Sequence, residues 1–213
     1  MKGILPILFL LSVACSAQTT TRITKASTIY DVSVNSGLCS DDGKCGPIKV
    51  TLYRKRSKEP FQSMVAGRLQ SDDVSKPIEF IDINFDGIND LFIFDGITAP
   101  GGNATFAHRI FLYSPRDRQF VFNEELSQLS REESFLLEPS GLRRKQILTY
   151  ARIGGGVFQN RWYRVVNNRP RMFKEIISDA TYKNGTRTLD TTRTLVKGKW
   201  IVRKKITKTI FNQ

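Results

Sequence analysis

Residues 82–91 have the sequence Asp82-Ile83-Asn84-Phe85-Asp86-Gly87-Ile88-Asn89-Asp90-Leu91, in which oxygen-bearing side chains recur at alternate positions. A wound loop with the pattern D-x-N-x-D-G-x-x-D directs these side chains toward one centre, and calcium binds about six to eight oxygen ligands. Gly87 permits the sharp bend, because a positive φ costs little without a Cβ. The expected ligands of one structural calcium ion (Ca2+) are the side chains of Asp82, Asn84, Asp86 and Asp90 and the carbonyl oxygen of Ile88.

The runs on either side of this loop, 78–81 and 91–94, are apolar and predict two strands that the loop joins. An EF-hand is excluded, because it needs flanking helices and a Glu at its twelfth position, where this chain has Ile93. The alternative is a turn without a metal, since Asp, Asn and Gly favour turns in any case. A bound ion is expected to join the two strands and to neutralise three carboxylates that otherwise repel each other.

Short apolar and β-branched runs, separated by turn signals, continue along the rest of the chain. The expected strands are 28–34, 48–53, 64–69, 78–83, 91–94, 109–113, 119–122, 146–153, 157–166, 171–177, 180–183, 186–189 and 200–211. Asn184-Gly185 is the strongest hairpin signal, and the last strand is expected to have one buried and one solvated face. Asn123 is expected to cap a short helix over 124–129. The predicted fold is all-β, with antiparallel meanders in a propeller-like or sandwich arrangement and at most one short helix.

The first 17 residues have the features of a secretory signal peptide: a basic start, a short apolar run and small residues after it. Two processing routes stay open. Ordinary cleavage would occur before Gln18, whereas the loose lipobox Ser12-Val13-Ala14-Cys15 would place a lipid anchor on Cys15. We expect residues 18–27 to be a flexible lead-in and 28–213 to form a single all-β domain in the periplasm or outer envelope, with no transmembrane span.

Export also predicts the state of the other two cysteines. Cys39 and Cys45 flank a turn-like segment, and in an oxidising compartment they are expected to form a disulfide. The alternative, two free thiols, is typical of the cytosol.

The chain carries 33 Lys and Arg against 20 Asp and Glu, a formal net charge of +13. Such a charge favours acidic partners. Nucleic acid is not expected for an exported protein, which leaves anionic lipid head groups, wall polymers or an acidic protein. The alternative is a generally basic surface without a specific partner.

Enzyme chemistry has little support in the sequence, and no catalytic residue is predicted. His108 is the only histidine, which removes most histidine-based acid–base and zinc chemistry. The carboxylate pairs Glu124-Glu125 and Glu132-Glu133 are sequence neighbours and are expected to be solvated surface. A hydrolase with two carboxylates across a cleft stays a weaker alternative.

The segment Phe80–Leu91 resembles the calcium loop of FG-GAP and VCBS-type β-propeller repeats. Its continuation resembles exported proteins typified by the periplasmic immunity protein of a bacteria-killing type IV secretion system. The residues that carry this resemblance are Gly101-Gly102-Asn103, Phe111-Leu112-Tyr113-Ser114-Pro115 and Phe120-Val121-Phe122-Asn123-Glu124-Glu125-Leu126-Ser127. That group implies an inhibitor of a lysozyme-like peptidoglycan hydrolase as the function. Many lysozymes are basic and would repel a basic inhibitor, so we expect a neutral or acidic partner.

Together these patterns predict an exported, calcium-stabilised binding protein of the envelope, with an envelope protein such as a peptidoglycan hydrolase as its partner. The alternative is a passive basic envelope component that holds anionic wall polymer or a lipid surface.

Overall fold

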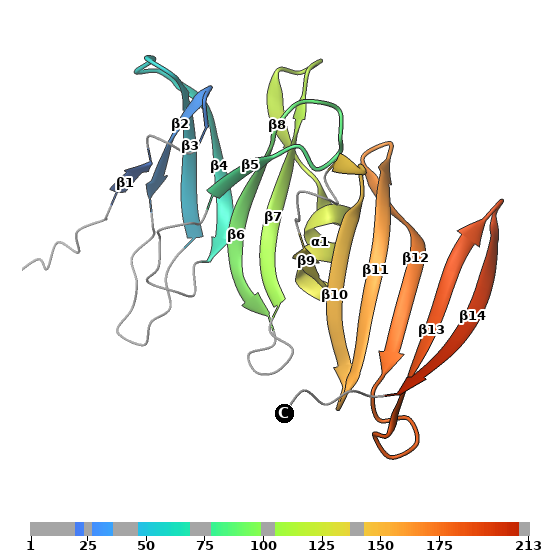
Figure 1. Ribbon diagram of the computed structural model, residues 1–213. Coiled ribbons are helices and arrows are strands. Elements are labelled where there is room, and N and C mark those ends of the chain that lie inside the picture. Colours follow the sequence, from blue (N-terminus) through green and yellow to red (C-terminus); the bar gives the residue numbers. More distant parts are fainter. Residues whose placement is uncertain are drawn as a thin grey trace, which may run out of the picture.

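The computed structural model describes residues 20–23, 27–35, 47–68, 78–98, 105–136 and 143–208. The strands form three antiparallel sheets, and each sheet is a meander in which strands that follow one another in sequence are neighbours (Figure 1). This arrangement confirms the predicted all-β fold built from antiparallel meanders. No helix within the described ranges is long and apolar enough to cross a membrane.

The first sheet contains β1 (Thr20–Ile23), β2 (Tyr30–Asn35), β3 (Pro47–Arg54) and β4 (Pro60–Arg68). The second contains β5 (Ile78–Ile81), β6 (Asp90–Thr98), β7 (Thr105–Ser114) and β8 (Gln119–Phe122). The third contains β9 (Ser134–Leu136), β10 (Ile147–Gly154), β11 (Val157–Val166), β12 (Arg169–Asp179), β13 (Arg187–Val196) and β14 (Lys199–Lys208). The helix α1 (Glu124–Glu132) lies between the second and third sheets in sequence and in space (Figure 1).

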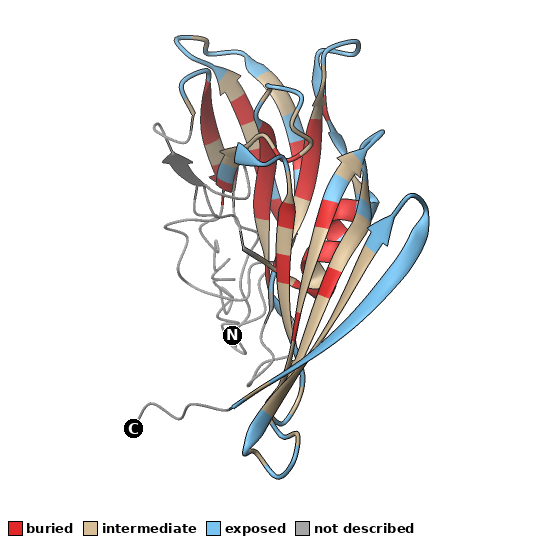
Figure 2. Ribbon diagram, turned by 45° about the vertical axis from the view of Figure 1, so that its right-hand side comes forward, coloured by how far each residue is buried: buried red, intermediate tan, exposed pale blue. Residues whose placement is uncertain are grey.

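The second sheet is the centre of the molecule, because both of its faces are buried. Along β6, Leu91 and Ile93 pack into one hydrophobic core and Phe92 packs into another. A strand with two buried faces has an unbroken apolar run, which is the pattern that residues 91–94 show. The buried residues in Figure 2 accordingly gather on the inner strands and on α1.

Two cores follow from this layering. The first lies between the first two sheets and contains Tyr30, Val32, Val34, Ile48, Val50, Leu52, Met64, Ile78, Leu91, Ile93, Phe111 and Phe120. The second joins the second sheet to α1 and the third sheet, and contains Ile83, Phe92, Ile110, Leu112, Leu126, Leu129, Ile147 and Tyr163.

Helix α1 continues the second sheet where β8 ends. The side chain of Asn123 accepts a hydrogen bond from Leu126 N at 2.9 Å and caps the helix, as predicted. β8 is shorter than β7 and does not pair with the residues before Phe111. There, the Ser127 hydroxyl accepts a hydrogen bond from Ile110 N at 2.9 Å, and the Ser130 hydroxyl accepts one from His108 N at 3.0 Å. Two helix hydroxyls therefore satisfy β7 amides that the short β8 leaves unpaired.

Two strand predictions were wrong. Residues 180–183 belong to a wide turn between β12 and β13, in which Gly185 N donates to Thr181 O at 3.1 Å. The last strand has no buried face, since nine of the ten residues of β14 are exposed. The reason is its position at the edge of the third sheet, where β13 is its neighbour (Figure 2).

Glu133 was also predicted wrongly as solvated surface, because the chain turns inward after α1 and leaves this residue only 4% exposed. It belongs to a buried ionic network with Glu175, which is 2% exposed. Arg161 contacts Glu133 through Nη1 and donates to Glu175 Oε1 through Nε at 2.9 Å. Arg193 Nη1 lies 3.1 Å from Glu175 Oε2, and the Tyr163 hydroxyl donates to Glu133 at 3.1 Å.

Replacing Glu175→Ala is expected to lower the free energy of unfolding by about 2 kcal/mol, because the partly exposed guanidinium groups of Arg161 and Arg193 each lose a charged hydrogen-bond acceptor. The measurement is urea unfolding at neutral pH. Glu132→Ala is the matched control, since Glu132 is exposed and its side chain accepts a hydrogen bond from Gln128 at 2.9 Å on the helix surface. Equal midpoints for the two variants would contradict a stabilising role for the network.

Candidate functional site

The loop between β5 and β6 is wound by hydrogen bonds from its own backbone. Asp86 N donates to Asp82 Oδ1 at 3.1 Å, and Gly87 N donates to Asp82 Oδ2 at 2.9 Å. Asp86 N is also 3.2 Å from Asn84 Oδ1, and Ile88 N donates to Asp86 Oδ1 at 2.8 Å. Gly87 has a φ of 91°, as the predicted bend requires. The alternate polar side chains therefore face inward on one short loop.

Asp90 has a different role from the other acidic residues of this loop. It is 0% exposed. Its Oδ2 accepts from Ile83 N at 3.1 Å and Asn84 N at 3.4 Å, and its Oδ1 accepts from Tyr113 N at 2.9 Å. Burial raises the pKa of Asp90 to about 6, and the backbone hydrogen bonds act in the opposite direction. The carboxylate thus ties both ends of the loop to β7.

The donor chemistry of the loop fits calcium, because the side chains of Asp82, Asn84, Asp86 and Asp90 offer oxygen atoms throughout. Carboxylate oxygens that already accept an amide hydrogen keep a second lone pair for a cation. Within the described ranges, no three His, Cys, Asp or Glu side chains gather closely enough to hold a metal by themselves.

The structure brings Asp82, Asn84 and Asp86 together on the loop, whereas Asp90 points to backbone amides. Asn84 Nδ2 also donates to Asp86 Oδ2 at 2.9 Å and to Asn168 Oδ1 at 3.3 Å, which links the loop to the turn between β11 and β12. Calcium binding by this set stays a prediction. Cys15, Cys39 and Cys45 lie outside the described residues.

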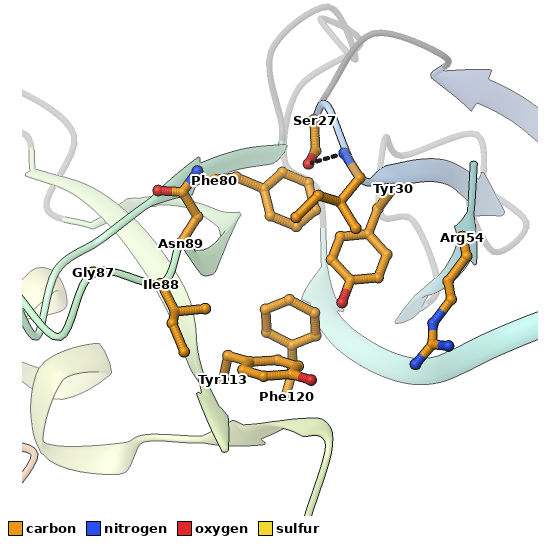
Figure 3. Close-up of a pocket in the computed structure, with 10 residues that line it drawn as sticks. Ser27, Tyr30, Arg54, Phe80, Gly87, Ile88, Asn89, Tyr113 and Phe120 are labelled. Atoms are coloured by element: carbon orange, nitrogen blue, oxygen red, sulfur yellow. Dashed lines mark hydrogen bonds between the residues drawn. The ribbon is translucent and has the colours of Figure 1, made fainter. Parts of the chain in front are cut away.

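A cleft that sequence reasoning did not identify lies beside the loop. It has a volume of about 500 Å³ and is lined by Ser27, Ile29, Tyr30, Arg54, Phe80, Gly87, Ile88, Asn89, Tyr113 and Phe120 (Figure 3). Ile88, expected only to supply a carbonyl oxygen, directs its side chain toward this space (Figure 3). The loop and the cleft therefore share one wall.

Four aromatic rings from both of the first two sheets pack together in the cleft. The Tyr30 and Phe80 rings are stacked with centroids 5.9 Å apart, and Tyr30 meets Phe120 edge-on at 5.6 Å. Tyr113 meets Phe120 edge-on at 5.3 Å. Such arrangements are favourable for aromatic pairs and hold the rings in place. The residues come from β2, β5, β7 and β8, so no local sequence pattern could have grouped them.

The cleft also contains one cationic group. The Arg54 guanidinium lies over the Phe61 ring, 4.9 Å from its centroid, and no carboxylate of the described residues pairs with it. Burial raises the pKa of Tyr30, Tyr113 adds to this effect, and Arg54 opposes it. Tyr30 is therefore close enough to interact with both Tyr113 and Arg54, and Figure 3 shows Tyr30 and Arg54 at one wall of the cleft and Tyr113 beside Phe120.

Comparisons with known proteins give one likeness in fold. No family model matches the chain, and no curated protein matches its sequence. Among solved structures, the chain is similar to "Structure of a Xanthomonas Type IV Secretion System related protein", with a TM-score of 0.65 and 17% sequence identity. The similarity covers 88% of this chain and 97% of that one. At this identity the likeness establishes a shared fold over most of the chain, and the resemblance of the loop to FG-GAP repeats stays a prediction.

Replacing Asp90→Asn is expected to lower the free energy of unfolding by about 2 kcal/mol, because at least one of the three amides that Asp90 accepts from then faces a donor instead of an acceptor. Asp86→Asn is the control, since Asp86 is exposed and an amide oxygen can still accept from Ile88 N. Urea unfolding of both variants in excess chelator measures the effect without a contribution from calcium. Equal stability of the two variants would show that Asp90 does not anchor the loop.

Proposed function

We propose that this protein is an exported, calcium-stabilised binding protein of the cell envelope that inhibits, or gives immunity to, a peptidoglycan hydrolase. The observation that carries the proposal is the fold likeness to the type IV secretion system related protein, which spans 88% of the chain. The segment Phe80–Leu91 adds to it, because its resemblance to calcium loops fits an extracellular scaffold.

The arrangement of the molecule suits binding better than turnover. Two cores hold the second sheet rigidly on both faces, and rigid scaffolds commonly present binding residues on their loops. Residues 99–107 are the segment that we propose to test first for partner binding. Residues 105–107 begin β7, and residues 99–104 lie outside the described residues. A calcium ion in the 82–90 loop would stabilise the base of this sheet. The proposed partner is neutral or acidic, since the chain has a net charge of +13.

Calcium is expected to raise the melting temperature of the protein. Extracellular sites commonly have dissociation constants of roughly 10⁻⁴ to 10⁻³ M. At about a hundred times the dissociation constant, binding adds about 2.7 kcal/mol, which corresponds to roughly 5–10 °C for a domain of this size. Thermal melts with calcium and with chelator measure the shift.

Asp86→Asn should abolish most of this calcium-dependent shift, because it removes one ligand charge and keeps the hydrogen bond from Ile88 N. The matched control is Asp117→Asn, an exposed carboxylate that accepts from the Ser114 hydroxyl at 2.8 Å in another turn. Identical melts of the unaltered protein with and without calcium would refute the calcium site.

A stoichiometric complex with an envelope protein is expected to survive high salt. The experiment is capture from an envelope extract with the tagged protein at high and low salt, with and without chelator, followed by a test of whether the captured hydrolase is inhibited. Chelator should weaken capture if the ion positions the binding loops. Wall-degrading activity of the purified protein itself would instead support an enzyme.

One observation favours a second candidate, a passive basic component of the envelope. The β13–β14 hairpin, residues 187–208, carries eight Lys and Arg and one Asp, and nine of the ten residues of β14 are exposed. A surface of this charge attracts anionic wall polymer or lipid head groups. Recovery of only salt-labile polymer or lipid in the capture experiment would favour this candidate, because screening weakens such contacts.

A further inference from the structure

The cleft between the first two sheets has the size and lining of a small-ligand site. Its volume of about 500 Å³ lies within the range of about 300–1,000 Å³ that is common for ligand pockets. Phe120 is 3% exposed and belongs to the first core, so the floor of the cleft is part of the folded scaffold. The cleft is therefore preformed and does not depend on a protein partner.

Three polar groups of the cleft have no hydrogen-bond or ion-pair partner among the described residues, whereas the Ser27 hydroxyl accepts a hydrogen bond from Ile29 N at 3.1 Å. In the described ranges, neither the Tyr30 nor the Tyr113 hydroxyl takes part in a hydrogen bond, and the Arg54 guanidinium forms no ion pair. Polar groups at the edge of an apolar site commonly fix the orientation of a ligand. The exposed side chain of Asn89 offers a donor and an acceptor on the opposite side of the cleft (Figure 3).

These features define the ligand chemistry. The faces of aromatic rings are electron-rich and attract the weakly positive C–H face of a sugar ring. Sugar hydroxyls can bond to phenol and amide groups at the rim, whereas a purely apolar acid would leave these groups unused. A planar guanidinium binds a carboxylate through two parallel hydrogen bonds. The exposed Arg56 and Lys58 follow Arg54 in sequence and add positive charge at this end of the sheet.

We propose that the cleft formed by Tyr30, Arg54, Phe80, Tyr113 and Phe120 binds a pyranose sugar that carries a carboxylate, with the sugar face against the partly exposed rings of Phe80 and Tyr113 and the carboxylate on Arg54. In the envelope, such sugars occur as muramic acid in wall glycan from which the stem peptide has been removed, and as uronic acid in anionic polysaccharides. The proposal goes beyond inhibition of a hydrolase, because it assigns a ligand to a site within this chain.

The test is titration of the full-length protein with defined sugars, followed by NMR of the tyrosine and phenylalanine rings and by calorimetry. The probes are N-acetylglucosaminyl-N-acetylmuramic acid, a digalacturonate, and the uncharged disaccharide N,N′-diacetylchitobiose. One or both carboxylated sugars should bind at least tenfold more tightly than the uncharged disaccharide. The stronger of the two carboxylated probes identifies the source of the ligand.

Arg54→Gln should weaken binding of the carboxylated sugar about tenfold or more and leave binding of the uncharged disaccharide unchanged. Arg171→Gln is the matched control, because Arg171 is exposed on β12 in the third sheet and loses the same charge. Tyr113→Phe should weaken the binding of both the charged and the uncharged sugar if the Tyr113 hydroxyl bonds to the sugar. The variant keeps the aromatic contact with Phe120.

Three outcomes would overturn the assignment: no binding by any of the sugars, equal binding of the charged and uncharged disaccharides, or equal loss in Arg54→Gln and Arg171→Gln. Whether the Arg54→Gln variant still captures an envelope protein separates the sugar-binding proposal from the proposed inhibitor function. If Arg54→Gln loses the sugar and keeps the protein partner, the cleft is a site of its own. If the sugar binds and no protein partner is found, the inhibitor function fails and the cleft assignment stands.

Discussion

The buried carboxylate of Asp90 is the contact on which the rest of the central sheet depends. It accepts hydrogen bonds from Ile83 N, Asn84 N and Tyr113 N, so one side chain joins the start of the loop, the start of β6 and the end of β7. A charged group that is 0% exposed is tolerated because three amides replace the water it loses. This anchor also determines where Ile88 and Asn89 stand relative to the aromatic cleft.

Burial on both faces of the second sheet follows from the same region of the chain. Leu91 and Ile93 enter the core shared with the first sheet, and Phe92 enters the core shared with α1 and the third sheet. A loop that moved β6 by one residue would exchange these faces, because side chains alternate along a strand. The loop between β5 and β6 therefore sets the register on which both cores depend.

Much of the fold was predictable because helices and strands are specified by residues close together in sequence. The cleft was not predictable, because its residues are far apart in sequence. Asn123 caps the helix and residues 91–94 form a strand, because capping and hydrophobic runs are decided by neighbouring residues. The cleft joins Tyr30 to Phe120 across two sheets, and only the packing of those sheets brings the rings together. Glu133 was misassigned for a related reason, since its buried partners, Arg161 and Tyr163, lie far along the chain.

In this protein the net charge indicates less about function than the position of one charged side chain does. Edge strands need protection from pairing with other chains, and lysines on an exposed edge supply it. The lysines of β14 can therefore be explained without any ligand, even though they dominate the basic hairpin. Arg54 is different, because it lies over the Phe61 ring at the wall of a cleft, and among the described residues neither its guanidinium nor the two phenol groups of the cleft have a hydrogen-bond or ion-pair partner. An unpaired cation held against an aromatic surface indicates an anionic ligand more specifically than a large net charge does.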